Sequence, residues 1–563
     1  MIYHCEDHTC NYWDEGEKLP ERCPQCGRKL LRANEADMTG DDWTALGNTL
    51  WDAEASDKKR MVDCFRKAAY LGSAWGVCNL GICMEQGNGV EADPVQAFWL
   101  YQQAVEMGSL NAVCCLGVCY QYGIGTAPDA KQAAELYCKA AEYGSPRGQM
   151  LLARAFHDGI GVEADAAEAV YWVRAAAYQR YGEGMHRLGV CYEYGDGVEQ
   201  NWEHAVHWFR EAAESGVSAA MTDLGYCYEK GCGVEQSWEQ AFSWYRRGAE
   251  CGYPVSMSNL GLCYKRGYGV DQNWQEAIKW YEQGAQCGDL QSMHNLACCY
   301  ERGEGVEQNE DRALYWYRRG AEAGSDYCMY CLGWNYSNGE GVEQNMTEAI
   351  RWYTAAAEGG NADAMHNLGW HYDYGEGVEQ DMKKAICWYE RAAEQNHPAA
   401  MNSLGECYAM GRGVPRDLET AMEWYRRAAE LGEAMADYNM GWHLEQAGKL
   451  SEAYAHYRKA ADGNDDSAWW ALGRFYENGV VVAQDGKEAR RCYETGEKLG
   501  SVKCKMRLAR CKLLGIGGHR AKKAGLDLCR QALELAKESS EKEDYGYEAE
   551  MNLLRRTIAE NES

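Results

Sequence analysis

The sequence predicts an all-α protein, a solenoid of paired helices, preceded by a small metal-bound domain. Similar segments recur every 36 residues, as the equal steps between Gly189, Gly225 and Gly261 show. Each copy holds two helical patterns separated by a glycine-rich turn, and cysteines cluster ahead of the first copy. A fixed period of this length is typical of repeat architectures, in which each unit stacks on its neighbours.

The repeats occupy residues 39–537. The residue that follows the leucine of the first helix serves as an anchor, and successive anchors lie 36 residues apart through most of the chain. The step shortens to 32 at Gly473, and the unit around Gly441 lacks the glycine-rich turn. The anchors are Gly47, Gly81, Gly117, Ala153, Gly189, Gly225, Gly261, Ala297, Gly333, Gly369, Gly405, Gly441, Gly473 and Ala509. About fourteen pairs of helices are therefore expected.

Each copy begins with a helix whose apolar residues share one face. In the copy anchored at Gly261 this helix covers residues 256–264, with Leu260 one residue before the anchor and Tyr264 three residues after it. At about 100° per residue these side chains lie on the same side. The Gly-x-Gly that follows ends the helix, because glycine adopts left-handed backbone angles at little cost.

The second helix of each copy has a start signal and a tryptophan in fixed register. An Asn or Asp lies four residues before an alanine, where its side chain accepts hydrogen bonds from the first turn. These N-cap residues are Asp93, Asp165, Asn201, Asn273, Asn309, Asn345, Asp381 and Asp417. The tryptophans are Trp172, Trp208, Trp244, Trp280, Trp316, Trp352, Trp388 and Trp424. We expect the tryptophans and the first-helix tyrosines to pack between units of an αα-hairpin array.

These residues resemble the Sel1-like repeat family. Its pattern is A-x-x-x-L-G-x-x-Y-x-x-G-x-G-V, then Asp or Asn, then A-x-x-W-Y-x-x-A-A-x-x-G, and the match covers roughly residues 40 to 537. The resemblance implies a right-handed superhelix of antiparallel helix pairs, related to tetratricopeptide arrays and used mainly to organise other proteins. Members are not, as a rule, enzymes. The resemblance therefore implies a non-catalytic scaffold.

Residues 1–38 are predicted to form a separate metal-bound domain. A segment this short cannot bury enough apolar surface to fold alone, so a metal would supply much of its folding energy. The expected ligands are Cys5, Cys10, Cys23 and Cys26. The sequence CPQCG resembles a rubredoxin-like zinc ribbon, but the Cys-x4-Cys spacing departs from the usual Cys-x2-Cys and leaves His8 as an alternative ligand. We expect structural zinc rather than iron, because four-thiolate ribbons are most often structural.

The cysteines within the repeats are predicted to be reduced packing residues. Seven of them form one column, two residues after the anchor: Cys83, Cys119, Cys191, Cys227, Cys263, Cys299 and Cys407. A ladder of disulfides would need a second matching column, which the sequence does not contain. The N-terminus lacks the features of a signal peptide, and no apolar run approaches the ~20 residues that span a bilayer. We therefore expect a cytoplasmic, bacterial protein that does not contact a membrane.

Charge and motifs argue against two further classes of function. The net charge of −29 is unfavourable for a protein that binds nucleic acid, since such proteins present basic faces. Neither G-x-S-x-G nor HExxH occurs, and no Gly-x-Gly is followed by the Lys-Ser or Lys-Thr of a phosphate-binding loop. The sequence therefore predicts neither a nucleic-acid binder nor an enzyme.

A protein or peptide partner is expected to bind on the first helices. Positions three residues before, one after and five after each anchor vary between copies, and the resemblance places them on the concave surface. Large aromatic residues gather there from Tyr330 onward. The expected contact residues are Tyr330, Trp334, His366, Trp370, Tyr374, Tyr438 and Trp442. Exposed aromatic clusters are typical binding anchors, whereas the alternative is that some of these rings pack against neighbouring helices.

The predicted function is a protein–protein interaction scaffold that holds a partner segment in this surface. The alternative is a regulatory subunit, or a redox or metal sensor, that modulates a partner enzyme. Residues 538–563 are polar and are expected to form a capping helix, because the open end of a solenoid needs a solvated outer face.

Overall fold

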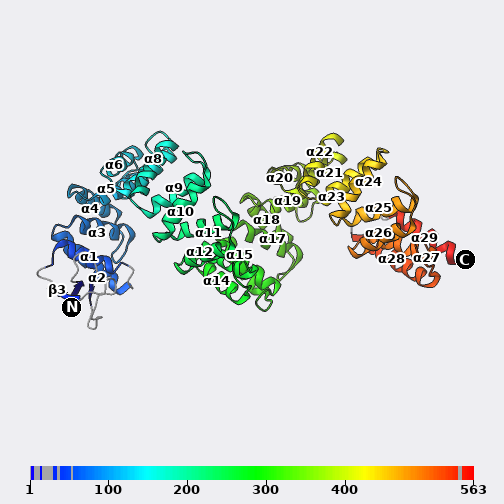
Figure 1. Ribbon diagram of the computed structural model, residues 1–563, viewed down its shortest axis with the longest axis horizontal. Coiled ribbons are helices and arrows are strands. Elements are labelled where there is room, and N and C mark those ends of the chain that lie inside the picture. The colour runs from blue at the N-terminus through cyan, green and yellow to red at the C-terminus, as the bar shows by residue number, and fades with distance from the viewer. Residues whose placement is uncertain are drawn as a thin grey trace. The chain divides into compact units, whose positions relative to one another are not determined.

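The computed structural model describes residues 2–5, 13–15, 30–33, 38–51, 55–542 and 548–562. The chain divides into two compact units, Met1–Ser292 and Met293–Ser563, which are described separately. Paired helices follow one another along each unit, as the blue-to-green and green-to-red parts of Figure 1 show.

Three short strands open the first unit. They are β1 (Ile2–Cys5), β2 (Trp13–Glu15) and β3 (Leu30–Ala33), and they form an antiparallel sheet in the order β2-β1-β3. Cys5 is the last residue of β1 and pairs with Leu30. The other predicted metal ligands, Cys10, Cys23 and Cys26, and the alternative ligand His8 lie outside the described residues. Among the residues that are described, no cluster of His, Cys, Asp or Glu could hold a metal ion.

From Gly40 onward every regular element that the structure describes is a helix. In the first unit these are α1 (Gly40–Thr49), α2 (Ala55–Tyr70), α3 (Ala74–Gln86), α4 (Pro94–Glu106), α5 (Leu110–Tyr122), α6 (Ala130–Glu142), α7 (Pro146–Asp158), α8 (Ala166–Tyr178), α9 (Gly182–Tyr194), α10 (Trp202–Glu214), α11 (Ser218–Lys230), α12 (Trp238–Glu250), α13 (Pro254–Arg266) and α14 (Trp274–Gln286).

The division between the units falls within α15. The remaining helices are α15 (Leu290–Arg302), α16 (Glu310–Glu322), α17 (Asp326–Asn338), α18 (Met346–Glu358), α19 (Ala362–Tyr374), α20 (Met382–Glu394), α21 (Pro398–Met410), α22 (Leu418–Glu430), α23 (Ala434–Gln446), α24 (Leu450–Asp462), α25 (Asp466–Asn478), α26 (Gly486–Lys498), α27 (Val502–Leu514), α28 (Lys522–Lys542) and α29 (Glu548–Glu562). In each pair the odd-numbered helix comes first.

The helix ends follow from the local sequence. All eight predicted N-cap residues accept a hydrogen bond from a backbone N–H of the first turn, which confirms that prediction. The Gly-x-Gly turns end the first helices: Gly267 follows α13 with φ of 74°, in the left-handed region. Its neighbour Gly269, at φ 67°, lies so close to the carbonyl of Trp238 that a Cβ atom would collide with it. The Gly-x-Gly turns therefore have a structural role.

The shortened unit lies where the sequence places it. Only residues 447–449 connect α23 and α24, whereas residues 411–417 connect α21 and α22. The left-handed glycine cap is missing at the end of α23, where Ala447 occupies the cap position. The deletion therefore removes the glycine-rich turn and keeps both helices at 13 residues.

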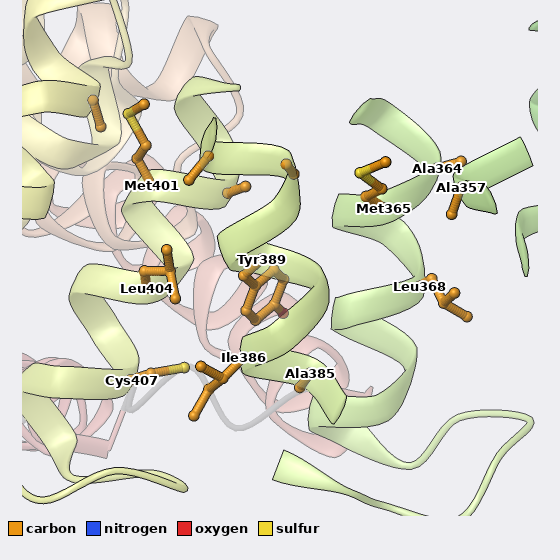
Figure 2. Close-up of a cluster of buried hydrophobic side chains, with 14 of the residues drawn as sticks. Ala357, Ala364, Met365, Leu368, Ala385, Ile386, Tyr389, Met401, Leu404 and Cys407 are labelled. Carbon is orange, nitrogen blue, oxygen red and sulfur yellow. The ribbon is translucent and has the colours of Figure 1, made fainter. Parts of the chain in front are cut away.

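The core is organised by an aromatic residue that the sequence reading did not single out. The tryptophans of the second helices are only partly buried, but the residue after each of them is completely buried in most pairs. Tyr389 is an example: Figure 2 shows it on α20, between the helix of Leu368 and the helix of Leu404. A Cβ atom on Gly369 would lie 2.7 Å from its ring, so the anchor is glycine because it lies against this tyrosine.

The cysteines match the prediction of reduced packing residues. The cysteines from Cys64 to Cys529 are all free, and the seven members of the predicted column are buried, whereas Cys251, Cys287 and Cys387 are exposed. Burial raises the pKa of Cys83 to about 11 and that of Cys227 to about 12. These thiols are therefore protonated at neutral pH, and a protonated thiol is a poor nucleophile.

Two helices close the C-terminal end. The 21-residue α28 runs to Lys542, past the predicted domain boundary at residue 537. Within the predicted capping segment, α29 packs against both α27 and α28. The carboxylate of Glu550 on α29 accepts hydrogen bonds from Arg507 and from the Trp470 indole, which ties the last helix to α27 and α25.

Candidate functional site

All seven residues of the predicted partner site lie in the second unit, on the first helices of their pairs. Tyr330 and Trp334 belong to α17, Tyr438 and Trp442 to α23, and the other three to α19. Four side chains are substantially exposed: Trp334 at 45%, Trp370 at 37%, Tyr374 at 54% and Trp442 at 38%. We call these four residues the aromatic surface.

The other three predicted residues are half-buried and pack on the core. The ring centroid of Tyr330 lies 6.0 Å from that of Tyr353, and the centroid of Tyr438 lies 5.6 Å from that of Tyr457. His366 makes the same contact with Tyr389 at 5.7 Å. The alternative of packing is therefore correct for the position three residues before the anchor, and exposure holds for the positions one and five residues after it.

Two rings of the aromatic surface form a pair on α19. The centroids of Trp370 and Tyr374 are 5.0 Å apart, because a spacing of four residues places them one above the other on the helix. The guanidinium carbon of Arg412 lies 5.9 Å from the Tyr374 ring centroid. Met410, the last residue of α21, is also 59% exposed. It occupies the position that corresponds to Tyr374 in the next repeat. The pair is thus bordered by a cation and a flexible apolar side chain.

A polar network joins the first helices behind these rings. Arg412, in the turn after α21, donates to the carboxylate of Asp373 on α19 at 2.8 Å, and its other nitrogen lies 3.7 Å from Glu406. The amides of Asn402 and Asn439 both donate to Glu406, at 3.1 and 3.2 Å, and so link α21 to α23. The sequence did not predict this network, because its partners belong to different helix pairs.

Burial shifts the pKa values of the acids in this network. It raises the pKa of Asp373 above its usual range, and the positive charge of Arg412 offsets part of that shift. Burial likewise raises the pKa of Glu406, against Arg412 and the two amides. Two carboxyl groups share one guanidinium here, at 2.8 Å from Asp373 and 3.7 Å from Glu406. The network therefore stiffens the helices that hold the rings.

His366 is neutral at physiological pH. Burial and the neighbouring His397 lower the pKa of His366 to about 4. Its ring stacks on that of His397 with centroids 5.2 Å apart, and its Nε2 lies 3.3 Å from the hydroxyl of Ser403. His366 thus connects α19 to α21 as a packed, uncharged ring.

The match between the helix pairs and a known repeat identifies the family. The Sel1 repeat matches twelve successive segments of the chain. The chain belongs to the Sel1 repeat family. The matched segments are 76–109, 112–145, 146–181, 182–217, 218–253, 254–289, 290–325, 326–361, 362–397, 398–433, 434–465 and 468–501. They correspond to α3 through α26, so α1 with α2 and α27 with α28 are the two further pairs that the 36-residue period predicts.

Solved structures of similar chains are Sel1 repeat proteins and related arrays. A protective antigen of uropathogenic Escherichia coli with an SLR fold is 30% identical, over 89% of this chain and 94% of that one, with a TM-score of 0.49. A Sel1 repeat protein from Oxalobacter formigenes is 28% identical, over 56% and 93%, with a TM-score of 0.41. Yeast Tom70 is 13% identical, over 87% and 96%, with a TM-score of 0.24. A search of curated proteins found no match.

Sel1 repeat proteins generally serve as scaffolds for protein interactions and are typically non-catalytic. None of the helices that the structure describes has the length and apolar composition that a membrane span requires.

Proposed function

We propose that this Sel1 repeat protein is a scaffold that binds a segment of a partner protein on the aromatic surface of its second unit. The observation that carries the proposal is the exposure of Trp334, Trp370 and Trp442. Each lies one residue after an anchor. The residue before that anchor, Leu332, Leu368 or Met440, is buried on the opposite side of the helix.

The chemistry of this surface favours a partner with apolar side chains. Large aromatic rings provide contact area at a low cost in side-chain entropy, and they are enriched among the residues that dominate binding energies. The rings lie on helices, and Asp373, Arg412 and Glu406 cross-link two of these helices to their neighbours. A surface held rigid before binding loses less conformational entropy when a partner binds.

The test is crosslinking capture from the native cell with a variant that removes the three tryptophans. Trp334→Ala, Trp370→Ala and Trp442→Ala together are expected to abolish capture of a discrete partner, while helix content and the thermal midpoint change little. The matched control replaces Trp75 and Trp99, which are more exposed, at 57% and 58%, and lie in the first unit. The control is expected to capture the partner as the wild type does. Equal capture by the triple variant would show that the aromatic surface is not the binding site.

The N-terminal segment is proposed to hold a structural zinc ion through Cys5, Cys10, Cys23 and Cys26. The donor set supports this proposal, because four thiolates suit a tetrahedral ion and leave no open position for catalysis. The antiparallel sheet in which β1 ends at Cys5 is compatible with a ribbon.

Metal content distinguishes the possibilities for this segment. One zinc ion per chain is expected by mass spectrometry of the purified protein, and a Cys23→Ser, Cys26→Ser variant is expected to lose it. His8→Ala is expected to retain it. Iron in place of zinc would favour the redox or metal sensor, and a protein without bound metal would refute the site.

A further inference from the structure

Among the helix pairs from α3 to α26, one lacks the aromatic residue that fills the core of the others. Twenty residues after the anchor, α8 carries Val173. In ten of the other pairs this position is aromatic and buried at the same spacing: Tyr101, Tyr137, Phe209, Tyr245, Tyr281, Tyr317, Tyr353, Tyr389, Tyr425 and Tyr493. The anchor also changes in this pair, where Ala153 replaces glycine. Alanine is also the anchor at Ala297, where Tyr317 is kept, so the missing ring is what distinguishes this pair.

A cavity occupies the position of the missing ring. It has a volume of about 380 Å³ and lies among α7, α8 and α9 of the first unit. Its buried floor is apolar and is formed by Ala153, Val170, Val173 and Cys191. The volume falls at the lower end of the ~300–1,000 Å³ that is usual for ligand sites. The cavity is therefore large enough to receive an aromatic ring, and its floor is apolar enough to bind one.

The other tyrosines show what polar group such a ring would need. The hydroxyl of Tyr101 donates to Glu85 at 2.6 Å, and that of Tyr245 donates to Glu229 at 2.9 Å. Both acceptors lie four residues after their anchors. In the pair with the cavity this position is His157, which lines the rim.

The rim of the cavity holds a charged network to which none of the described tyrosines is hydrogen-bonded. His157 Nε2 lies 3.2 Å from Asp196 Oδ2, and its Nδ1 lies 2.6 Å from Asp158 Oδ1. Arg187 approaches the same Asp196 oxygen at 3.8 Å. An ionised carboxylate has about four lone-pair sites, more than these two contacts use, so Asp196 is able to accept a further hydrogen bond.

We propose that this cavity binds a phenol ring supplied by a ligand, in place of the tyrosine that the pair lacks. The ring lies on Val173 and Ala153, and its hydroxyl donates to the carboxylate of Asp196 beside His157. An apolar floor of this kind binds an aromatic ring because the ring gains contacts that water cannot make. The ring is either a free phenol or the side chain of a tyrosine in a partner.

The test is a titration of the full chain with 4-methylphenol, in which isothermal titration calorimetry measures the binding. The blocking variant is Ala153→Gly, Val173→Tyr, which restores the glycine and tyrosine of the other pairs and is expected to abolish binding. The matched control is Ala153→Gly alone, which leaves the cavity open and is expected to bind as the wild type does. If the blocking variant misfolds, Val173→Phe replaces it, because Phe209 already occupies this position in the next pair.

Two further probes test the hydroxyl and the source of the ring. Toluene is expected to bind about tenfold more weakly than 4-methylphenol, the value of roughly one buried hydrogen bond. N-acetyl-tyrosinamide that binds more tightly than 4-methylphenol would assign the ring to a peptide, and weaker binding would assign it to a free phenol. The proposal is overturned if 4-methylphenol does not bind, if the blocking variant binds it equally well, or if toluene binds as tightly.

Discussion

Replacing Tyr389 with alanine is expected to lower the free energy of unfolding of the second unit by about 3–5 kcal/mol, the usual cost of removing a buried aromatic side chain. Tyr389 is 1% exposed and lies in the largest core cluster, between α19 and α21 (Figure 2). The Tyr389 hydroxyl also lowers the pKa of the buried Asp373, against the effect of burial, and this contribution would be lost. Because Gly369 lies against the ring, no neighbouring side chain fills the space that is left.

The residue beside it provides the matched control. Trp388 is larger than Tyr389 but only partly buried, and its ring contacts Arg391 near the surface. Trp388→Ala is therefore expected to cost only about 1 kcal/mol. Urea unfolding of both variants, followed by circular dichroism, measures the difference. A larger loss for Trp388→Ala would show that the tryptophan organises the core, contrary to the burial of the two side chains.

Replacing Arg507 with leucine is expected to destabilise the C-terminal end by about 3–5 kcal/mol, because a buried carboxylate would lose its charged partner. Arg507 on α27 donates twice to Glu550 on α29, at 2.7 and 2.8 Å, and once to Glu477 on α25, at 3.3 Å. The side chains of Arg507 and Glu550 are 13% and 7% exposed. Glu477 keeps a second charged partner in Arg510, whereas Glu550 keeps the Trp470 indole and the electrostatic attraction of Lys503.

A double variant separates the cost of the unpaired charge from the value of the pair. Arg507→Leu with Glu550→Leu is expected to recover most of the lost stability, since a buried ion pair is worth little more than apolar residues of similar volume. Arg426→Leu removes an exposed arginine that also pairs with two glutamates, and it is expected to leave the urea midpoint unchanged. A double variant as unstable as Arg507→Leu alone would mean that the pair itself, and not the orphaned charge, holds α29 in place.

The same network makes the C-terminal end sensitive to acid. Burial tends to raise the pKa of Glu477, but the Tyr493 hydroxyl and the two arginines hold it below its usual value. A carboxyl group with a depressed pKa adds stability that is complete above its unfolded pKa of about 4.3 and is lost as the pH falls through the folded pKa. The destabilisation by Arg507→Leu is therefore expected to shrink below pH 4.

Much of the fold follows from the sequence, because each repeat element has a local cause. The N-caps need only an Asn or Asp before the second helix, and the first helices end at glycines. The buried tyrosine was missed because Trp388 and Tyr389 are adjacent aromatic residues, about 100° apart on the helix. The anchor glycine identifies the buried one, since only Tyr389 lies against Gly369.

The candidate site was predictable in its exposed part alone. Trp334 and Trp370 stand out because they depart from the smaller residues of their column. Asp373 and Arg412 are 39 positions apart in the sequence. No local pattern predicts which side chains of neighbouring repeats meet. The cavity, in contrast, has a signal in the sequence that is recognised once the buried aromatic column is known: Val173 interrupts that column.

The second glycine of each turn has a consequence for the growth of the array. In five successive copies a Cβ atom on this glycine would collide with a backbone carbonyl of the preceding second helix, which belongs to Pro94, Ala130, Ala166, Trp202 or Trp238. In three later copies the nearest atoms belong instead to the side chains of Glu310, Met346 and Met382. Where the contact is made to main-chain atoms, it does not depend on the side chain of the residue that supplies them. A newly duplicated 36-residue segment would therefore fit behind any of those five copies, and this part of the chain could lengthen or shorten by whole repeats during evolution without a compensating substitution at the junction.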